Sequence, residues 1–172
     1  MKVRNSIIID SNIEEVWRIL AVEFDRAGDW MSFVPNSYAI ETGYMAEEAP
    51  MVGRVCEFTP EATGARADER ITTFDPENKL LVFEVVPIDA PMPVHKNTIS
   101  VKLFDLGHNE TEVQWDSDLD LKSLGYVMYP MVKVMVKKTF NKILEELKVY
   151  TETGEPHPRK LKATEKQMAL QG

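Results

Sequence analysis

Residues 111–150, TEVQWDSDLDLKSLGYVMYPMVKVMVKKTFNKILEELKVY, join an alternating strand to a long amphipathic helix. The strand places mostly apolar side chains at every second position: Val113, Trp115, Ser117, Leu119 and Leu121. Acidic and amide side chains occupy the positions between them: Glu112, Gln114, Asp116, Asp118 and Asp120. One apolar and one polar face are typical of a strand in an antiparallel sheet that covers a core on one side.

The segment from about Val127 to Tyr150 changes to helical spacing. Its apolar spine consists of Val132, Val136, Phe140, Ile143 and Leu147, widened by Met131, Met135 and Leu144. Lysines and other polar residues face the opposite way, which predicts a helix that lies with one face on the sheet. Pro130 fits this helix only in its first turn or at a kink, because proline removes a backbone donor.

Upstream, short stretches suited to strands are separated by Gly, Pro, Asn and Asp, the residues of tight turns. They predict strands at 2–10, 37–44, 53–59, 65–74, 79–87, 94–105 and 110–121. Two short helices are expected after the first strand. The first begins at the S-x-x-E capping spacing of Ser11 and Glu14, and the second spans about 23–33. The order predicts an α+β domain with a seven-stranded antiparallel sheet.

Several short motifs follow one another in an order that resembles a known family. They are Ile13–Trp17 (IEEVW), Asp29-Trp30 with Val34-Pro35, Glu69–Ile71 followed by Phe74-Asp75, Thr111–Trp115 (TEVQW), and a closing helix with Leu124, Pro130, Phe140, Leu144, Leu147 and Lys148. Over residues 3–150 the chain resembles the START/SRPBCC superfamily, specifically the polyketide cyclase/dehydrase and lipid transport family. The resemblance implies a helix-grip fold, in which the sheet curves around the long C-terminal helix. It also implies a cavity for an apolar molecule such as a sterol, lipid, polyketide or hormone. Only some members of this family are enzymes, so the fold does not decide the function.

The phase of the strands, taken from the resemblance at Glu69 and from alternation elsewhere, indicates which side chains face the cavity. From the sheet we expect Phe58, Ala67, Glu69, Ile71, Thr73, Phe83, Val85, His95, Asn97, Ile99, Val101 and Trp115. From the helices we expect Trp30, Met128, Met131, Met135, Val136 and Phe140. Apolar walls with a few convergent polar groups are the usual composition of a small-molecule pocket. The alternatives are that the methionines fill the core, that Glu69 pairs with a basic neighbour at the sheet edge, and that His95 lies in a loop.

Composition narrows the function classes. The net charge is −8, which disfavours nucleic acid as a partner. The three histidines are not spaced from one another, or from Cys, Asp or Glu, as metal ligands are, so we expect no metal. The sequence has no glycine motif for binding phosphate or a dinucleotide, so we expect no cofactor. The single cysteine, Cys56, is expected to be a packing residue. We also expect no transmembrane segment and, because the N-terminus lacks a secretory signal, a cytoplasmic location.

The sequence therefore favours a protein that binds or carries a small hydrophobic molecule. The alternative is a cyclase or dehydratase that acts on a polyketide-like substrate, with Glu69 and His95 as candidate catalytic residues, helped by Tyr126 or Tyr129. A co-chaperone-like interaction module is a third class, without a recognisable docking motif. We expect the ligand-binding domain to span residues 1–153. Residues 154–172 then form a polar basic tail that is dispensable for stability, with a short helix possible at 160–170.

Overall fold

The computed structural model describes residues 1–58, 64–90 and 93–171. Its strands are β1 (Lys2–Ile9), β2 (Asn36–Ile40), β3 (Gly53–Glu57), β4 (Arg66–Asp75), β5 (Leu80–Ile88), β6 (Val94–Gly107) and β7 (Glu110–Leu121). Its helices are α1 (Ile13–Trp17), α2 (Ala27–Trp30), α3 (Ser123–Val127), α4 (Tyr129–Thr153) and α5 (Pro158–Gln171). A π-helical turn, η1 (Arg18–Val22), and a 3-10 turn, η2 (Phe24–Arg26), separate α1 from α2. Thr59, the last residue of one expected strand, lies outside the described residues.

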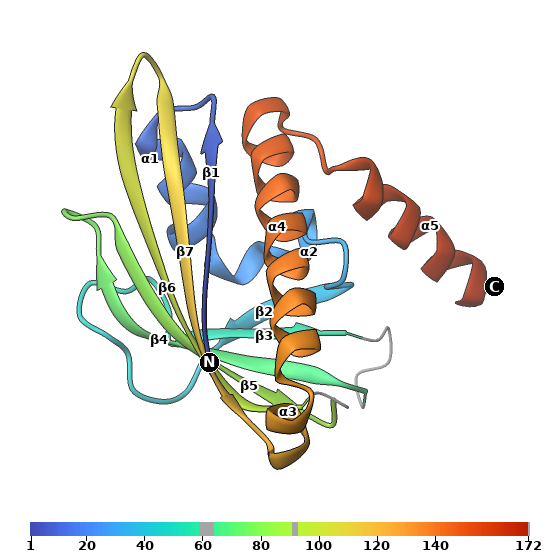
Figure 1. Ribbon diagram of the computed structural model, residues 1–172. Helices are drawn as coiled ribbons and strands as arrows, with labels where there is room; N and C mark the ends of the chain where they lie inside the picture. The colour runs from blue at the N-terminus through green and yellow to red at the C-terminus, as the bar shows by residue number, and fades with distance from the viewer. Residues whose placement is uncertain (59–63, 91–92, 172) are drawn as a thin grey trace.

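The seven strands form one antiparallel sheet in the order β1-β7-β6-β5-β4-β3-β2. The two edge strands, β1 and β2, are neighbours in sequence, and the short helices carry the chain from one edge to the other. The long helix α4 runs along one face of the sheet, where it packs against β1 (Figure 1). This arrangement confirms the helix-grip fold expected from the sequence.

Side-chain burial on β7 and α4 explains how the two elements pack together. All five inward positions of β7 that the alternation predicts are buried. Val132, Ile143 and Leu147 of α4 are buried against the sheet, and Pro130 lies in the first turn of the helix, as expected. The helix ends at Gly154, whose φ of +74° is a left-handed conformation that glycine adopts without strain.

The N-terminal helices differ from the expectation. The cap of α1 is Asn12, whose Oδ1 accepts a hydrogen bond from the backbone N–H of Glu15 at 2.9 Å. The capping box expected at Ser11 is wrong, because the helix begins one residue later and Asn12 supplies the side-chain cap. The backbone carbonyl of Ser11 accepts a hydrogen bond from the Thr111 hydroxyl at 2.8 Å. The helix expected at 23–33 is also shorter, since only η2 and the four residues of α2 are helical.

Two β-bulges change which side chains face inward. The pairing of β4 with β5 shifts between Ile71 and Thr73, and that of β6 with β7 shifts between Val94 and Lys96. Each bulge inserts one unpaired residue, after which the alternation of the strand is reversed. Thr73 is consequently exposed, and not directed at the cavity as the alternation predicts.

The first turn of α5 is attached to the rest of the domain. The Lys160 side chain is buried, and its Nζ donates a hydrogen bond to the carbonyl of Val34 at 2.8 Å. The Arg159 guanidinium donates to Glu145 at 2.7 Å and lies 3.1 Å from Glu146. A helix is therefore present where the sequence allowed one, and its contacts argue against a dispensable tail.

Candidate functional site

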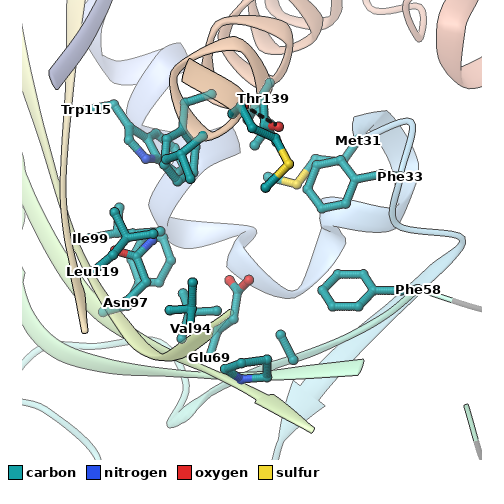
Figure 2. A pocket seen from close by; sticks show the side chains of 18 of the residues that line it. Met31, Phe33, Phe58, Glu69, Val94, Asn97, Ile99, Trp115, Leu119 and Thr139 are labelled. Atoms are coloured by element: carbon teal, nitrogen blue, oxygen red, sulfur yellow. Dashed lines mark hydrogen bonds between the residues drawn. The ribbon is translucent and has the colours of Figure 1, made fainter. Parts of the chain in front are cut away.

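A cavity of about 430 Å³ lies between the sheet and the inward face of α4. Side chains from the strands, from α4 and from the turn after α2 converge on it (Figure 2). Of the side chains expected to face the cavity, the structure brings these to its wall: Phe58, Ala67, Glu69, Phe83, Val85, Asn97, Ile99, Trp115, Met135, Val136 and Phe140.

Ten further residues line the cavity without having been expected there: Met31, Phe33, Arg54, Pro87, Pro93, Val94, Leu119, Val132, Thr139 and Ile143. Some of them carried a signal. Arg54 lies four residues before Phe58 on the same face of one extended segment, and Leu119 alternates with Trp115. Met31 and Phe33 lie in an irregular turn, where no periodicity indicates a direction.

His95 does not reach the cavity. It is the unpaired residue of the bulge in β6, and its side chain is exposed. The bulge turns Val94 inward instead, so that Val94 lines the cavity beside Asn97. The expectation that His95 faces the ligand is wrong, because the bulge interrupts the alternation of β6 at this residue.

Five other expected residues also lie elsewhere. Met128 and Met131 are exposed and do not line the cavity. The inward side of α4 carries Val132 and Ile143 instead. Trp30 and Ile71 are each 2% exposed and belong to the packed core next to the cavity. Val101 is likewise a core residue.

Arg54 and Glu69 form a buried ion pair in the cavity wall. Arg54 Nε and Nη2 lie 2.7 and 2.6 Å from Glu69 Oε2. Arg54 also donates to the carbonyl of Phe24 at 2.7 Å, and its guanidinium lies 4.0 Å from the centroid of the Phe24 ring. The Arg54 cation is thus fixed by the protein, while the Glu69 carboxylate points into the cavity (Figure 2).

The register of the sheet places the charged and amide side chains of the cavity wall in one row. Arg54 pairs with Glu69, Glu69 with Val85, Val85 with Asn97, and Asn97 with Leu119. Glu69 and Asn97 therefore flank Val85, each one strand away from it. A ligand group above Val85 can meet a carboxylate on one side and an amide on the other.

Two buried polar atoms of the wall lack a hydrogen-bond partner among the described residues. They are Oδ1 of Asn97 and Nε1 of Trp115. Such atoms usually bond to a ligand or to ordered water, because leaving them unpaired is costly. Thr139, in contrast, donates its hydroxyl to the backbone carbonyl of Met135 at 3.0 Å (Figure 2).

The turn that carries Met31 and Phe33 is held by α4. The fully buried carboxylate of Glu146 accepts hydrogen bonds from the backbone N–H and the hydroxyl of Ser32, at 2.9 and 2.7 Å. With Lys160 bonded to Val34, this turn is fixed from two helices. The position of one cavity wall therefore depends on α4 and on the first turn of α5.

The remaining candidates do not form a second site. Burial raises the pKa of the Cys56 thiol well above its usual range, which favours the unreactive neutral form. Tyr129 is exposed and does not line the cavity, and the side chain of Tyr126 lies outside the described residues. Within the part of the chain that the structure describes, no three His, Cys, Asp or Glu side chains are grouped as metal ligands, and no helix is long and apolar enough to cross a bilayer.

Residues 1–152 match the family model described as polyketide cyclase/dehydrase and lipid transport. Among solved structures, a START superfamily protein from Mycobacterium smegmatis shares 15% identity over 88% of this chain and 97% of that chain, with a TM-score of 0.68. The protein XoxI from Bacillus cereus shares 17% identity over 91% of this chain and 99% of that chain, with a TM-score of 0.66. The Zhui aromatase/cyclase from Streptomyces sp. R1128 shares 13% identity over 91% of this chain and 99% of that chain, with a TM-score of 0.64. No curated protein sequence matches the chain significantly.

Proposed function

Because the chain belongs to the polyketide cyclase/dehydrase and lipid transport family, we propose that it binds or transports a small hydrophobic molecule, such as a lipid or polyketide, in the cavity beneath α4. The observation that supports this proposal most directly is the composition of the wall. Apolar side chains form most of it, and its charged and amide side chains lie in the row that contains Glu69 and Asn97. This is the usual composition of a site for a mostly apolar ligand with one polar end.

Two neighbouring residues of α4 provide a matched test. Met135 lines the cavity and is half-exposed, whereas Val134 is similarly exposed and does not line it. A charged side chain at Met135 would bring a carboxylate to the edge of an apolar cavity, which is unfavourable for an apolar ligand. Met135→Glu should weaken saturable binding of the neutral fluorophore N-phenyl-1-naphthylamine by at least about tenfold, or 1.4 kcal/mol. Val134→Glu should leave it unchanged.

Fluorescence titration measures both variants, and circular dichroism establishes that they are folded. If the folded wild-type protein binds none of a panel of neutral apolar probes, the proposal fails. Equal weakening in both variants would also contradict it, because the effect would then come from the outer surface of the helix.

The alternative function is a cyclase or dehydratase that uses general acid–base chemistry, and the Glu69 carboxylate supports it. A buried carboxylate that points into an apolar cavity can accept a proton from a bound substrate. The fixed Arg54 cation holds that carboxylate in place. His95 can no longer serve as its partner, so this alternative rests on Glu69 alone.

Glu69→Gln separates the two functions. Glutamine keeps an acceptor for Arg54 but cannot carry the proton. In an enzyme, turnover of a poly-β-keto thioester should fall by about 10²- to 10⁴-fold while binding persists. In a carrier, wild type should show no turnover of this substrate, and Glu69→Gln should change only the preference among ligands with different polar ends. Chromatographic analysis of the product and fluorescence competition give the two readouts.

A further inference from the structure

The segment that leads into and forms the first half of α4 is basic, although the chain as a whole is acidic. Residues 121–144 contain five lysines and no Asp or Glu, whereas the chain as a whole has a net charge of −8. All 28 acidic residues therefore lie outside this segment. A local basic region on an acidic protein is attracted to an anionic surface that the rest of the molecule repels.

The same segment exposes large apolar side chains. Within nine residues these are Val127, Met128, Tyr129, Met131, Val134 and Met135, with Val127 81% and Met131 56% exposed. Exposed apolar residues are common singly, but a contiguous group marks a site of interaction. Met131, Val134 and Met135, together with Lys138 and Lys142, form what we call the α4 docking face.

Apolar and basic side chains share one side of the helix. Met131, Val134, Met135, Lys138 and Lys142 follow the spacing i, i+3, i+4, i+7 and i+11, and all five are exposed. This side adjoins the cavity at Met135 and is otherwise exposed, and it begins at the end of α4 nearest α3 (Figure 1). The apolar surface of the helix thus extends from the cavity, where Met135 lies at its edge, to the exposed Met131 and Val134.

The lysines of this face are free to act on a partner. Lys138 and Lys142 form no ion pair with any described residue, and neither do Lys133 and Lys137 on the other side of the helix. At the other end of the same helix, Lys148 lies 2.8 Å from Glu152 and 3.9 Å from Asp10. Among the lysines of α4, only Lys148, which lies beyond residues 121–144, is paired with carboxylates among the described residues.

We propose that the α4 docking face binds the surface of an anionic lipid bilayer. Helices that carry lysines and apolar side chains on one side bind at the interface, where apolar side chains enter the headgroup region and lysines meet anionic lipids. Met135 belongs to the docking face and also lines the cavity, so the face adjoins the proposed ligand site. Membrane docking goes beyond the proposed function, and it can be present or absent whatever the cavity holds.

A second copy of the chain fits this face less well. In a two-fold symmetric dimer the same patch meets itself, which would bring the unpaired lysines of both copies together. A nucleic acid would satisfy the lysines but not the exposed methionines and valines. A bilayer with anionic headgroups offers both an apolar layer and negative charge.

Vesicle co-sedimentation of the full chain tests the proposal. We expect binding to vesicles of 70% phosphatidylcholine and 30% phosphatidylglycerol, at least tenfold weaker binding to pure phosphatidylcholine, and loss of most binding in 0.5 M NaCl. Met131→Ser with Val134→Ser, and separately Lys138→Glu with Lys142→Glu, should each weaken binding at least tenfold. Lys162→Glu with Lys166→Glu, two exposed lysines of α5, is the control and should have little effect.

Each contrary result has a distinct meaning. Absent vesicle binding, equal binding to neutral vesicles, or an effect of the α5 control as large as that of the α4 variants would overturn the docking proposal. So would a dimer in sedimentation velocity that Met131→Ser with Val134→Ser dissociates. Neither Met131 nor Val134 lines the cavity, so fluorophore binding should persist in that variant. If the wild-type protein does not bind the fluorophore, this result would instead count against the proposed function.

Discussion

Replacing Arg54 by methionine removes one half of the buried ion pair and keeps most of the apolar length of the side chain. Arg54 is 4% and Glu69 8% exposed, so the carboxylate would remain in an apolar wall without its cation. Breaking a buried pair in this way costs about 3–5 kcal/mol. At about 2–4 °C per kcal/mol for a domain of this size, the melting temperature should fall by about 6–20 °C.

The double variant Arg54→Met with Glu69→Leu is the control, since apolar residues often replace a buried ion pair at little cost. It should regain at least half of the lost stability, with the remainder explained by the Phe24 carbonyl that loses its donor. Thermal and urea denaturation followed by circular dichroism measure both variants. A single variant within about 1 kcal/mol of wild type, or a double variant no more stable than the single one, would refute this account of the pair.

Three further predictions follow from buried groups. Because burial raises the pKa of Cys56, iodoacetamide at pH 8 should label the thiol only after unfolding, and rapid labelling of the native protein would contradict its placement. Burial lowers the pKa of Lys160 in the folded state below the value of 10.5 for a free lysine. Between these two pKa values the unfolded state binds more protons than the folded state, so the unfolding free energy should rise as the pH increases toward 10.5. Urea titrations from pH 8 to 10.5 should show this rise in wild type but not in Lys160→Met. Truncation after Thr153 should destabilise the domain by about 1–3 kcal/mol, because the Val34 carbonyl loses the buried donor of Lys160. An unchanged melting temperature would instead mean that the tail is dispensable for stability.

The sequence was most informative where one period continued through an element. The alternation of β7 predicted the inward position of Trp115, and the spine of α4 predicted the inward side of Val136 and Phe140. The failures lie where the period breaks. A bulge adds one residue without any special composition, so nothing in the sequence around His95 indicated that it would turn outward.

The side chains of α4 show a second limit of pattern reasoning. Apolar residues occur on both the inner and outer sides of this helix, so hydrophobicity alone could not decide that Val132 faces inward and Met131 outward. Arg54 shows a third limit. The phase of its strand indicated an inward position, but a charged residue is expected inside only when its partner is known. The partner is Glu69, and only the pairing of β3 with β4 reveals that the two residues lie side by side.

The strand order has a consequence for how the newly made chain folds. β1 begins at Lys2, yet its hydrogen-bonding partner is β7, and Ile7 pairs with Val113. At about 5–20 residues per second, translation reaches β7 roughly 5–20 s after β1 has been made. During this interval the Ile7-Ile8-Ile9 run has no native partner strand and is exposed to other nascent chains. The sheet can therefore close only after β7 has been made, and yield should depend on how well β1 is protected until then.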